Sequence, residues 1–264
     1  MDRIPDQRLS ERLALCRVDS VDSTNLEAER RLRDGRVSGP TLIVAAEQRG
    51  GEGRRGAVWL SPRGGLWVTL IWPLLEPPRE LNGLGLRLGA ACLKAVDHFV
   101  EGAAQLKWPN DILIRDAKVC GCMARTATFH GSTWGIAGIG INVSNPMELA
   151  SPGLGRAVTS LGEAMGSPPA LEGVLIVLAD HLERLLLDDA GLADSLLELL
   201  NERLWGIGRS VELGQGTERV RGELLRLGPG GVPIVRDEAG REVAVHPGAS
   251  EMSPQDGGSR SEEQ

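Results

Sequence analysis

A short segment made only of glycine, arginine and one glutamate runs from Arg49 to Gly56 and constrains the fold more than any other feature of the chain. It follows the apolar residues 41–46, which predict a buried strand. Glycine allows positive φ and close approach of a ligand to the backbone, and loop N–H groups together with arginine can surround an anion. We therefore expect a strand that delivers an anion-binding loop, which becomes ordered when its ligand binds. A surface turn with solvated arginines is the alternative for this segment alone.

The glycine spacing in this segment also matches two familiar nucleotide-binding patterns, and the surrounding sequence argues against both. Gly51, Gly53 and Gly56 fit G-x-G-x-x-G, but residues 57–73 predict a loop and a strand instead of the helix that a dinucleotide site needs. The His-Arg-Asp and Asp-Phe-Gly signatures of protein kinases are missing from the sequence. Ala57 stands where a Walker A motif requires lysine, so that phosphate loop is excluded as well.

The composition limits the class of protein. Hydrophobic residues make up 41% of the 264 residues, so the chain can bury a substantial core. A net charge of −7 argues against nucleic-acid binding through bulk charge, although a local patch at Arg49, Arg54 and Arg55 is compatible with it. The four cysteines and four histidines lack metal-ligand spacing, so we expect buried reduced thiols and no metal site. The charged N-terminus and the lack of a long apolar run predict a soluble cytoplasmic protein.

Hydrophobic periodicity predicts alternating helices and strands in the first half of the chain. Ser23, Thr24 and Asn25 are N-cap residue types, so they either cap a helix or face a polar ligand. The alternating glycines of 135–140 allow tight strand packing, or they let another chain segment or a flat ligand lie against the strand. We expect helices at 10–15, 26–32 and 81–100, and strands at 41–46, 65–72, around 106, and at 112–114, 118–124 and 134–143.

The second half changes character after Trp205. Two leucine-rich amphipathic helices are expected at 171–187 and 192–204, with their apolar faces in the core. Short strands separated by glycine turns follow and predict a small β-barrel. We therefore expect an α+β fold with a catalytic domain at 1–205, a β-domain at 206–250 and a disordered tail at 251–264.

Taken in order, the motifs of this chain resemble those of biotin protein ligases over about residues 18–250. They are Ser23-Thr24-Asn25, the segment from Gln48 to Trp59, Lys107-Trp-Pro-Asn-Asp111, Lys118-x-x-Gly121 and Gly138-x-Gly-x-Asn142. The Lys-Trp-Pro-Asn-Asp block followed by Lys-x-x-Gly is the most specific part. The resemblance implies a catalytic domain like those of class II aminoacyl-tRNA synthetases, with a mixed, largely antiparallel sheet. It also implies that the C-terminal β-domain is an SH3-like barrel.

The resemblance implies a ligase that uses ATP and Mg2+ to convert biotin into biotinyl-5′-AMP with release of pyrophosphate. The biotinyl group then passes to a lysine of the biotin carboxyl carrier protein or domain of a biotin-dependent carboxylase. No enzyme-bound covalent intermediate is implied, and the sequence shows no Ser/His/Asp or Cys/His nucleophile set. Such chemistry depends on positioning and charge stabilisation, which glycine loops, arginine and lysine supply.

Site residues follow from the same resemblance, one position at a time. The implied catalytic residues are Lys118, Arg54 and Asp111. The implied biotin-binding residues are Ser23, Thr24, Asn25, Gln48, Glu52, Gly53, Arg54, Lys118 and Gly121. The implied ATP-binding residues are Arg54, Arg55, Trp59, Lys107, Asn110, Lys118 and Asn142. A plain turn-forming role is the alternative for Asp111.

Two departures from the family pattern qualify this expectation. Glu52 stands where the family loop usually carries its first arginine, and Ala57 where a further arginine is common. One close charge contact at the surface is worth a few kcal/mol at most, so we expect weaker retention of the adenylate. Only 22 residues precede Ser23, so we expect no winged-helix domain and no DNA binding. An exposed sheet edge would allow carrier docking or a weak homodimer, with a monomer as the alternative.

Other functions remain open at the level of sequence. A lipoate- or octanoyl-transfer enzyme of the related fold would differ in acid specificity. A non-catalytic protein that captures biotin or its adenylate would bind ligand without releasing pyrophosphate, and Glu52 is the feature that favours it. The last alternative is an unrelated α/β domain whose motifs coincide by chance.

Overall fold

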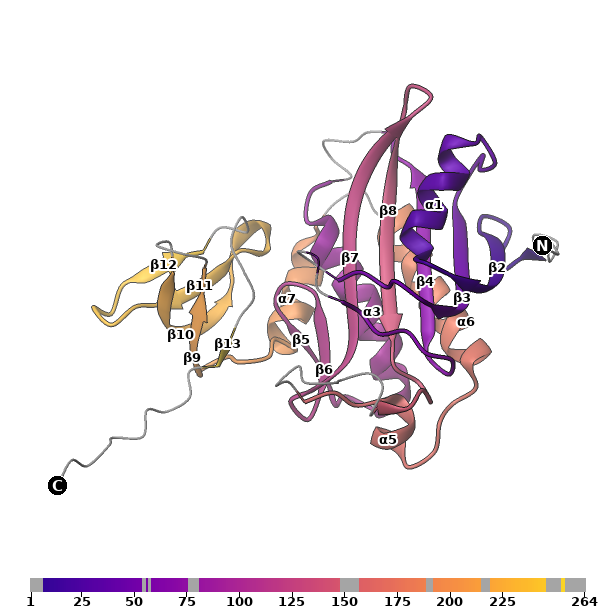
Figure 1. The fold of residues 1–264 in the computed structure, drawn as a ribbon. Helices are drawn as coiled ribbons and strands as arrows, with labels where there is room; N and C mark the ends of the chain where they lie inside the picture. The colour runs from indigo at the N-terminus through magenta and orange to yellow at the C-terminus, as the bar shows by residue number, and fades with distance from the viewer. Residues whose placement is uncertain are drawn as a thin grey trace.

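An eight-stranded sheet forms the centre of the molecule in the computed structural model, which describes residues 7–53, 56, 58–75, 81–147, 157–188, 192–214, 219–245 and 253–254 (Figure 1). The strand order is β1-β2-β3-β4-β8-β7-β6-β5. The strands are β1 (Gln7–Arg8), β2 (Ala14–Val21), β3 (Thr41–Gln48), β4 (Leu66–Pro73), β5 (Ala104–Lys107), β6 (Asp111–Ile114), β7 (Ala117–Phe129) and β8 (Ser132–Ile141). Only β2 and β3 run parallel among these neighbours, so the predicted mixed, largely antiparallel sheet is confirmed.

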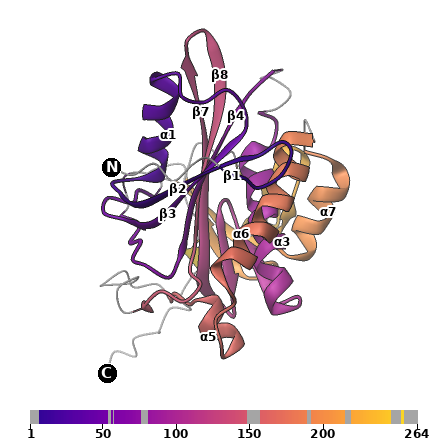
Figure 2. The same cartoon turned by 90° about the vertical axis from the view of Figure 1, so that its right-hand side faces the viewer.

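Helices cover both faces of this sheet. Helix α1 (Thr24–Arg33) lies on one face, and α3 (Leu84–Val100), α6 (Leu171–Leu182) and α7 (Asp194–Glu202) lie on the other (Figure 2). The short α5 (Leu161–Met165) begins with a capping box at Ser160 and Glu163. Helix α6 continues as a π-helical segment, η2 (Glu183–Asp188). The predicted helices near 26–32, 81–100, 171–187 and 192–204 are therefore confirmed with slightly different ends.

Alternation along the strands decides what each face buries. In β4, Val68 and Leu70 point into the core shared with α3, whereas Trp67 and Ile71 point to the face that carries α1. All four are completely buried, and burial of each such side chain contributes about 1.5–3 kcal/mol. The core is therefore built from both sheet faces at once.

The cysteines are free and buried, which confirms the predicted reduced thiols. Cys92 of α3 meets two cysteines of β7, and hydrogen bonding with Cys120 and Cys122 raises the pKa of the Cys92 thiol well above its usual range. The Cys92 thiol therefore stays protonated, and the buried cysteines behave as small apolar side chains.

The helix predicted at 10–15 is wrong. Residues 14–21 form β2, which pairs in parallel with β3 from Ala14 opposite Thr41 to Val21 opposite Gln48. The local pattern was too short to reveal this pairing, which buries Leu15 and Cys16 on opposite faces. Tertiary pairing has therefore overridden local helix propensity.

A second, antiparallel sheet follows in the C-terminal part of the chain (Figure 1). Its strands are β9 (Ser210–Leu213), β10 (Val220–Leu227), β11 (Pro233–Arg236), β12 (Glu242–Ala244) and β13 (Ser253–Pro254), in the order β12-β11-β10-β9-β13. The short 3₁₀ turn η3 (Pro229–Gly231) connects β10 to β11. No pairing between β12 and β13 closes the sheet in the described ranges, so the predicted barrel is not confirmed and an open sheet is observed. Apart from β13, residues 251–264 lie outside the described part of the chain.

None of the helices described here combines the length and apolar character that crossing a bilayer requires.

Candidate active site

The face of the sheet that carries α1 becomes a glycine floor towards one end of β8. Ile136 packs under α1, and Gly138 and Gly140 follow it on the same face. A Cβ atom at Gly138 would lie 2.6 Å from the Asn25 amide, and one at Gly140 would lie 2.4 Å from Trp59 Nε1. Both distances are shorter than a real Cβ contact, so a side chain at either position would have to displace Asn25 or Trp59, and the glycines are needed for this close approach. The open choice between tight strand packing and close approach is resolved in favour of contact with Asn25 and Trp59.

The N-terminus of α1 lies beside this floor, where Asn25 meets Gly138. Ser23 occupies the N-cap position and is buried, yet its side chain makes no capping hydrogen bond. The N–H of Thr24, the first helical residue, donates to the Gln48 side chain, and the helix dipole favours a partner that carries negative charge at this terminus. Ser23 is thus a helix cap by position but not by hydrogen bonding.

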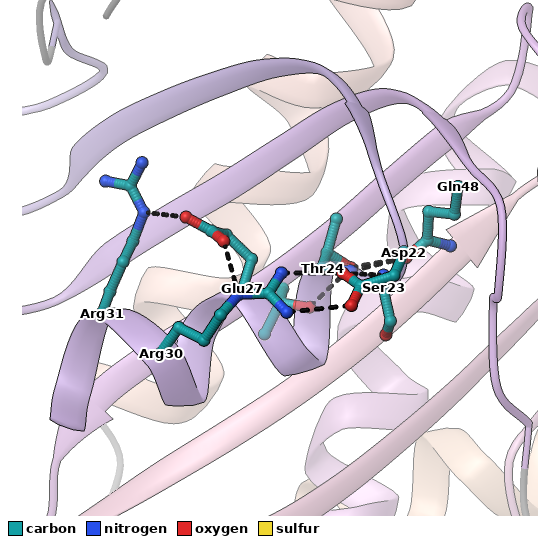
Figure 3. A network of polar contacts seen from close by, with 8 residues as sticks. Asp22, Ser23, Thr24, Glu27, Arg30, Arg31 and Gln48 are labelled. Carbon is teal, nitrogen blue, oxygen red and sulfur yellow. Dashed lines mark hydrogen bonds and ion pairs between the residues drawn. The ribbon is translucent and has the colours of Figure 1, made fainter. Parts of the chain in front are cut away.

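A polar network fixes the side chains beside this helix terminus (Figure 3). Thr24 donates from its N–H and its hydroxyl to Gln48 Oε1, at 2.8 and 3.0 Å, and Gln48 Nε2 donates to Ser61 Oγ at 2.8 Å. The hydroxyl of Thr69 lies 2.8 Å from both Thr24 Oγ1 and Asn25 Oδ1. Because these contacts set the orientation of the two amides, the network prepares Gln48 and Asn25 to present defined donors and acceptors.

An ion pair ties the turn before α1 to the helix itself (Figure 3). Asp22 accepts two hydrogen bonds from Arg30, at 2.7 and 2.9 Å, and one from the N–H of Ser23 at 2.8 Å. The hydrogen bonds from Arg30 lower the pKa of Asp22 to about 2. The Asp22 carbonyl also accepts a hydrogen bond from Gly50 N at 2.8 Å, so this turn holds the start of the glycine loop as well.

A lysine on β7 lies between a carboxylate and an aromatic ring. Lys118 Nζ is 2.7 Å from Asp111 Oδ1 and 4.7 Å from the centroid of the Trp59 ring. The two charged side chains are only 20% and 11% exposed, so their charges interact with little screening. Trp59 also meets Gly121 of β7, where a Cβ atom would come within 3.1 Å of both Trp59 and Lys118. The predicted residues Lys118, Asp111, Trp59 and Gly121 are therefore brought together.

A β-bulge explains the Lys-x-x-Gly spacing. Cys120 pairs with Ile112 and Lys118 pairs with Leu113, so Val119 is the extra residue in β7. A bulge shifts the alternation of a strand, and here Val119 and Cys120 are both buried in the core. The lysine therefore points to the same face as the glycine three residues later, which a regular strand would not allow.

The glycine loop leaves β3 and returns to the site at Trp59. Trp59 N donates to Gly51 O at 2.8 Å, and Glu52 pairs with Val58 in an isolated bridge. A Cβ atom at Gly51 would lie 2.3 Å from the Trp59 carbonyl, so this glycine is required by the fold of the loop. Glu52 is exposed and Gly53 is half-buried. Arg54 and Arg55 lie outside the described residues, so their predicted roles stay predictions.

Three residues that were predicted to contact the nucleotide make contacts within the protein. Asn110 Nδ2 donates to Cys122 O at 3.0 Å, and Asn142 Nδ2 donates to Thr159 O at 3.1 Å. Lys107 Nζ lies 5.1 Å from the centroid of the Trp205 ring, at the junction with the second sheet. Their predicted contacts with ATP therefore remain predictions.

The sequence-based predictions did not include Ser61 and Thr69, and they gave Gly138 and Gly140 no role in the site. Thr69 was detectable as the one hydroxyl in the otherwise apolar strand Leu66–Pro73. The glycines were noticed but not assigned, and nothing in the sequence connects Ser61 with Gln48.

These groups can hold an elongated ligand. Fixed amides and a helix N-terminus at one end suit a polar ring, and Lys118 at the other suits an anion. No group of three His, Cys, Asp or Glu side chains gathers as a metal site in the part of the chain that the structure describes. Mg2+ in nucleotide sites relies mostly on phosphates and one or two carboxylates, and Asp111 is the carboxylate that would serve here.

Comparison with known proteins gives a consistent result. Residues 17–142 match the model of the biotin/lipoate A/B protein ligase family. The biotin–[acetyl-CoA-carboxylase] ligase of Paracoccus denitrificans is 31% identical over 230 residues, which cover 84% of this chain and 94% of that protein. The biotin protein ligase of Aquifex aeolicus, in complex with biotin and ATP, matches with a TM-score of 0.71 and 29% identity over 91% of this chain and 98% of its own.

Bifunctional relatives are longer. The bifunctional ligase/repressor BirA of Salmonella typhimurium is 32% identical over 145 residues, which cover 54% of this chain and 44% of that protein. The chain thus matches less than half the length of this relative.

Proposed function

Since the chain belongs to the biotin protein ligases of the biotin/lipoate A/B protein ligase family, we propose that it activates biotin with ATP and transfers the biotinyl group to a carrier protein. The first step forms biotinyl-5′-AMP: a biotin carboxylate oxygen attacks the α-phosphorus, and the bond to pyrophosphate breaks. The second step joins the biotinyl carbonyl to a lysine amine of the carrier and releases AMP and a proton.

The position of the Lys118 ammonium group supports this proposal most strongly. It lies between Asp111 and Trp59, and Trp59 in turn packs against the glycine floor. Two anions, the biotin carboxylate and the α-phosphate, repel each other as they approach. A partly desolvated ammonium reduces that repulsion and stabilises the charge that builds up in the transition state. The ion pair with Asp111 keeps the lysine directed at the site, and Asp111 would also hold Mg2+ brought by the nucleotide.

Biotin would lie between the N-terminal end of α1 and Lys118. The uncapped helix terminus at Ser23, with Thr24, Asn25 and Gln48, offers donors and acceptors to the ureido ring. Because Gly121 has no side chain, Lys118 and Trp59 can both lie close to the strand, where they would flank the ligand.

The nucleotide would occupy the Trp59 side, where the indole offers a stacking face. Further residues assigned to ATP by resemblance are Arg54, Arg55, Lys107, Asn110 and Asn142. Glu52, Gly53 and Arg54 would close over the adenylate.

The carrier would be the biotin carboxyl carrier domain of a biotin-dependent carboxylase. Support comes from the named activity of the Paracoccus relative. In the described ranges β1 pairs with β2 only at Ala14 and Leu15, so the rest of this edge can accept an added strand. The C-terminal sheet, which resembles an SH3-like domain in its run of short strands, would contribute to the ATP side or to carrier docking.

Pyrophosphate release with ATP, Mg2+ and biotin, followed by mass spectrometry for biotinyl-AMP, tests the first step. We expect adenylate from the wild-type protein and none from Lys118→Ala. Lys94→Ala removes the same charge from α3 and should keep full activity, which makes it the matched control. Replacing biotin by lipoate tests acid specificity. Biotin binding without pyrophosphate release from the wild type would refute the proposal in favour of a binding protein.

A further inference from the structure

Trp205 lies where the chain leaves the helices and enters the second sheet. Its indole is buried, and the segment before it extends the edge of the main sheet. Leu106 N donates to Arg203 O at 2.8 Å, and Trp205 N donates to Leu106 O at 2.9 Å. This edge of the main sheet is therefore covered by the same segment that leads to β9 (Figure 1).

Three charged residues from different segments meet at this indole. Trp205 Nε1 donates to Asp116 Oδ1 at 2.5 Å, and Arg209 Nη1 lies 3.3 Å from the same oxygen. Lys107 Nζ and Arg209 Cζ lie 5.1 and 5.3 Å from the ring centroid, within the range of cation–π attraction. We refer to Lys107, Asp116, Trp205 and Arg209 together as the Trp205 joint.

Two residues of the joint flank the segment that carries Asp111, the ion-pair partner of Lys118. Lys107 pairs with Asp111 in the β5–β6 ladder, and Asp116 lies two residues before Lys118. Asp116 is also the second residue of the turn between Ile114 and Ala117, where its φ is 66°. Non-glycine residues adopt positive φ only infrequently, so a contact that fixes Asp116 also fixes the start of β7.

We propose that the Trp205 joint positions Lys118 against Asp111, so that correct seating of the second sheet is a condition for adenylate formation. Lys107, Asp116 and Trp205 are then positioning residues. Lys107 acts through the indole instead of by direct contact with the nucleotide. The proposal rests on the function proposed above, because it assigns these residues a part in the reaction at Lys118.

The variant Asp116→Gly removes the contacts of Asp116 within the joint and leaves the turn intact. Glycine suits the positive φ of the turn, so the hairpin keeps its stability, while the acceptor for Trp205 and Arg209 is lost. We expect kcat for biotinyl-AMP formation to fall about 10- to 100-fold with the KM for biotin unchanged. Asp116→Asn keeps an acceptor and tolerates the turn, so it should retain most of the activity. Wild-type kcat in Asp116→Gly would overturn the proposal, as would an equal loss in both variants.

A double-mutant cycle tests the role of Lys107. Lys107→Met keeps the length of the side chain and removes its charge. If Lys107 acts through the joint, combining it with Asp116→Gly should lower kcat little more than Asp116→Gly alone. If it binds ATP directly, Lys107→Met should raise the KM for ATP, and the two effects should multiply, which would overturn its assignment to the joint.

If the wild-type protein makes no adenylate, the proposed function fails. Hydrogen exchange measured by mass spectrometry would then still test whether Asp116 and Trp205 hold their two segments together. Amides at 111–121 and 203–209 should exchange faster together in Asp116→Gly than in the wild type. Unchanged exchange in either segment would overturn the joint itself.

Discussion

At the scale of single residues, the sign of one charge in the glycine loop sets how long an adenylate would stay bound. Glu52 is exposed in the loop that would close over the adenylate, and the family pattern has arginine there. We predict that Glu52→Arg slows dissociation of biotinyl-AMP by about tenfold or more, since one close charge contact is worth up to a few kcal/mol. Dissociation is measured by chase with unlabelled biotin after adenylate formation. Glu198→Arg, the same change on the exposed face of α7, should have no effect.

The Asp22–Arg30 pair makes stability depend on pH. Its contribution is modest, about 1 kcal/mol or less, because both side chains are more than one-third exposed. The folded-state pKa of Asp22 is about 2, below its ordinary value of 3.8, so the contribution is complete above that value and disappears as the pH falls towards 2. Urea unfolding should therefore find Asp22→Asn less stable than the wild type at pH 7, with most of this difference lost at pH 2. A difference as large at pH 2 as at pH 7 would contradict this assignment.

Resemblance to a known family predicted several residues that the structure places in contact. Lys118 and Asp111 were predicted in this way and form an ion pair, and Thr24 and Gln48 were predicted in this way and share a hydrogen bond. Ser61 could not be predicted, because its role depends on where the return of the glycine loop places it. No short-range pattern encodes that contact.

At the scale of elements, the glycine floor of β8, formed by Gly138 and Gly140, allows a direct test of the site. Gly138→Ala should push the Asn25 amide out of place and raise the KM for biotin. Gly140→Ala should displace Trp59 and weaken the nucleotide side. We expect losses of about 10- to 100-fold in kcat/KM with little loss of stability, because alanine is tolerated in strands. Gly39→Ala, where a Cβ atom meets nothing within 4 Å, is the matched control. Equal activity in all three variants would exclude a role for the floor.

Elements with strong periodicity were predictable and those fixed by pairing were not. The long helix α3 was expected from its apolar repeat. In contrast, β2 was not predicted, and the wrong helix at 10–15 overlaps its start, because the parallel partner of β2 lies more than twenty residues away in the chain. The bulge at Val119 was equally invisible, since it is defined by the register with β6. The open order of the second sheet depends on which strands pair, and turn positions alone do not determine that.

At the scale of the whole molecule, a few side chains connect the two sheets. Asn201 of α7 donates to Leu227 O at 3.1 Å and accepts from Leu227 N at 2.7 Å, and Trp108 Nε1 donates to Gly231 O at 3.3 Å. Trp108 belongs to the Lys-Trp-Pro-Asn-Asp block, so part of that motif serves the connection between sheets.

Removing this connection should loosen the second sheet. Asn201→Ala leaves both Leu227 backbone groups without a partner and should cost about 1–3 kcal/mol. Chemical denaturation measures the loss, and proteolysis in the C-terminal sheet should become faster. Asn110→Ala, which removes a side-chain bond within the main sheet, should not accelerate that cleavage.

The pairing of β4 with β8 joins residue 66 to residue 141 and has a consequence for folding kinetics. This contact closes a long loop, whereas β2, α1 and β3 assemble from neighbouring sequence. The floor at Gly138 and the amide of Asn25 therefore meet only after the long loop has closed. A ligand of this site can bind only the nearly finished molecule. It should slow unfolding and leave the rate of folding unchanged in stopped-flow experiments.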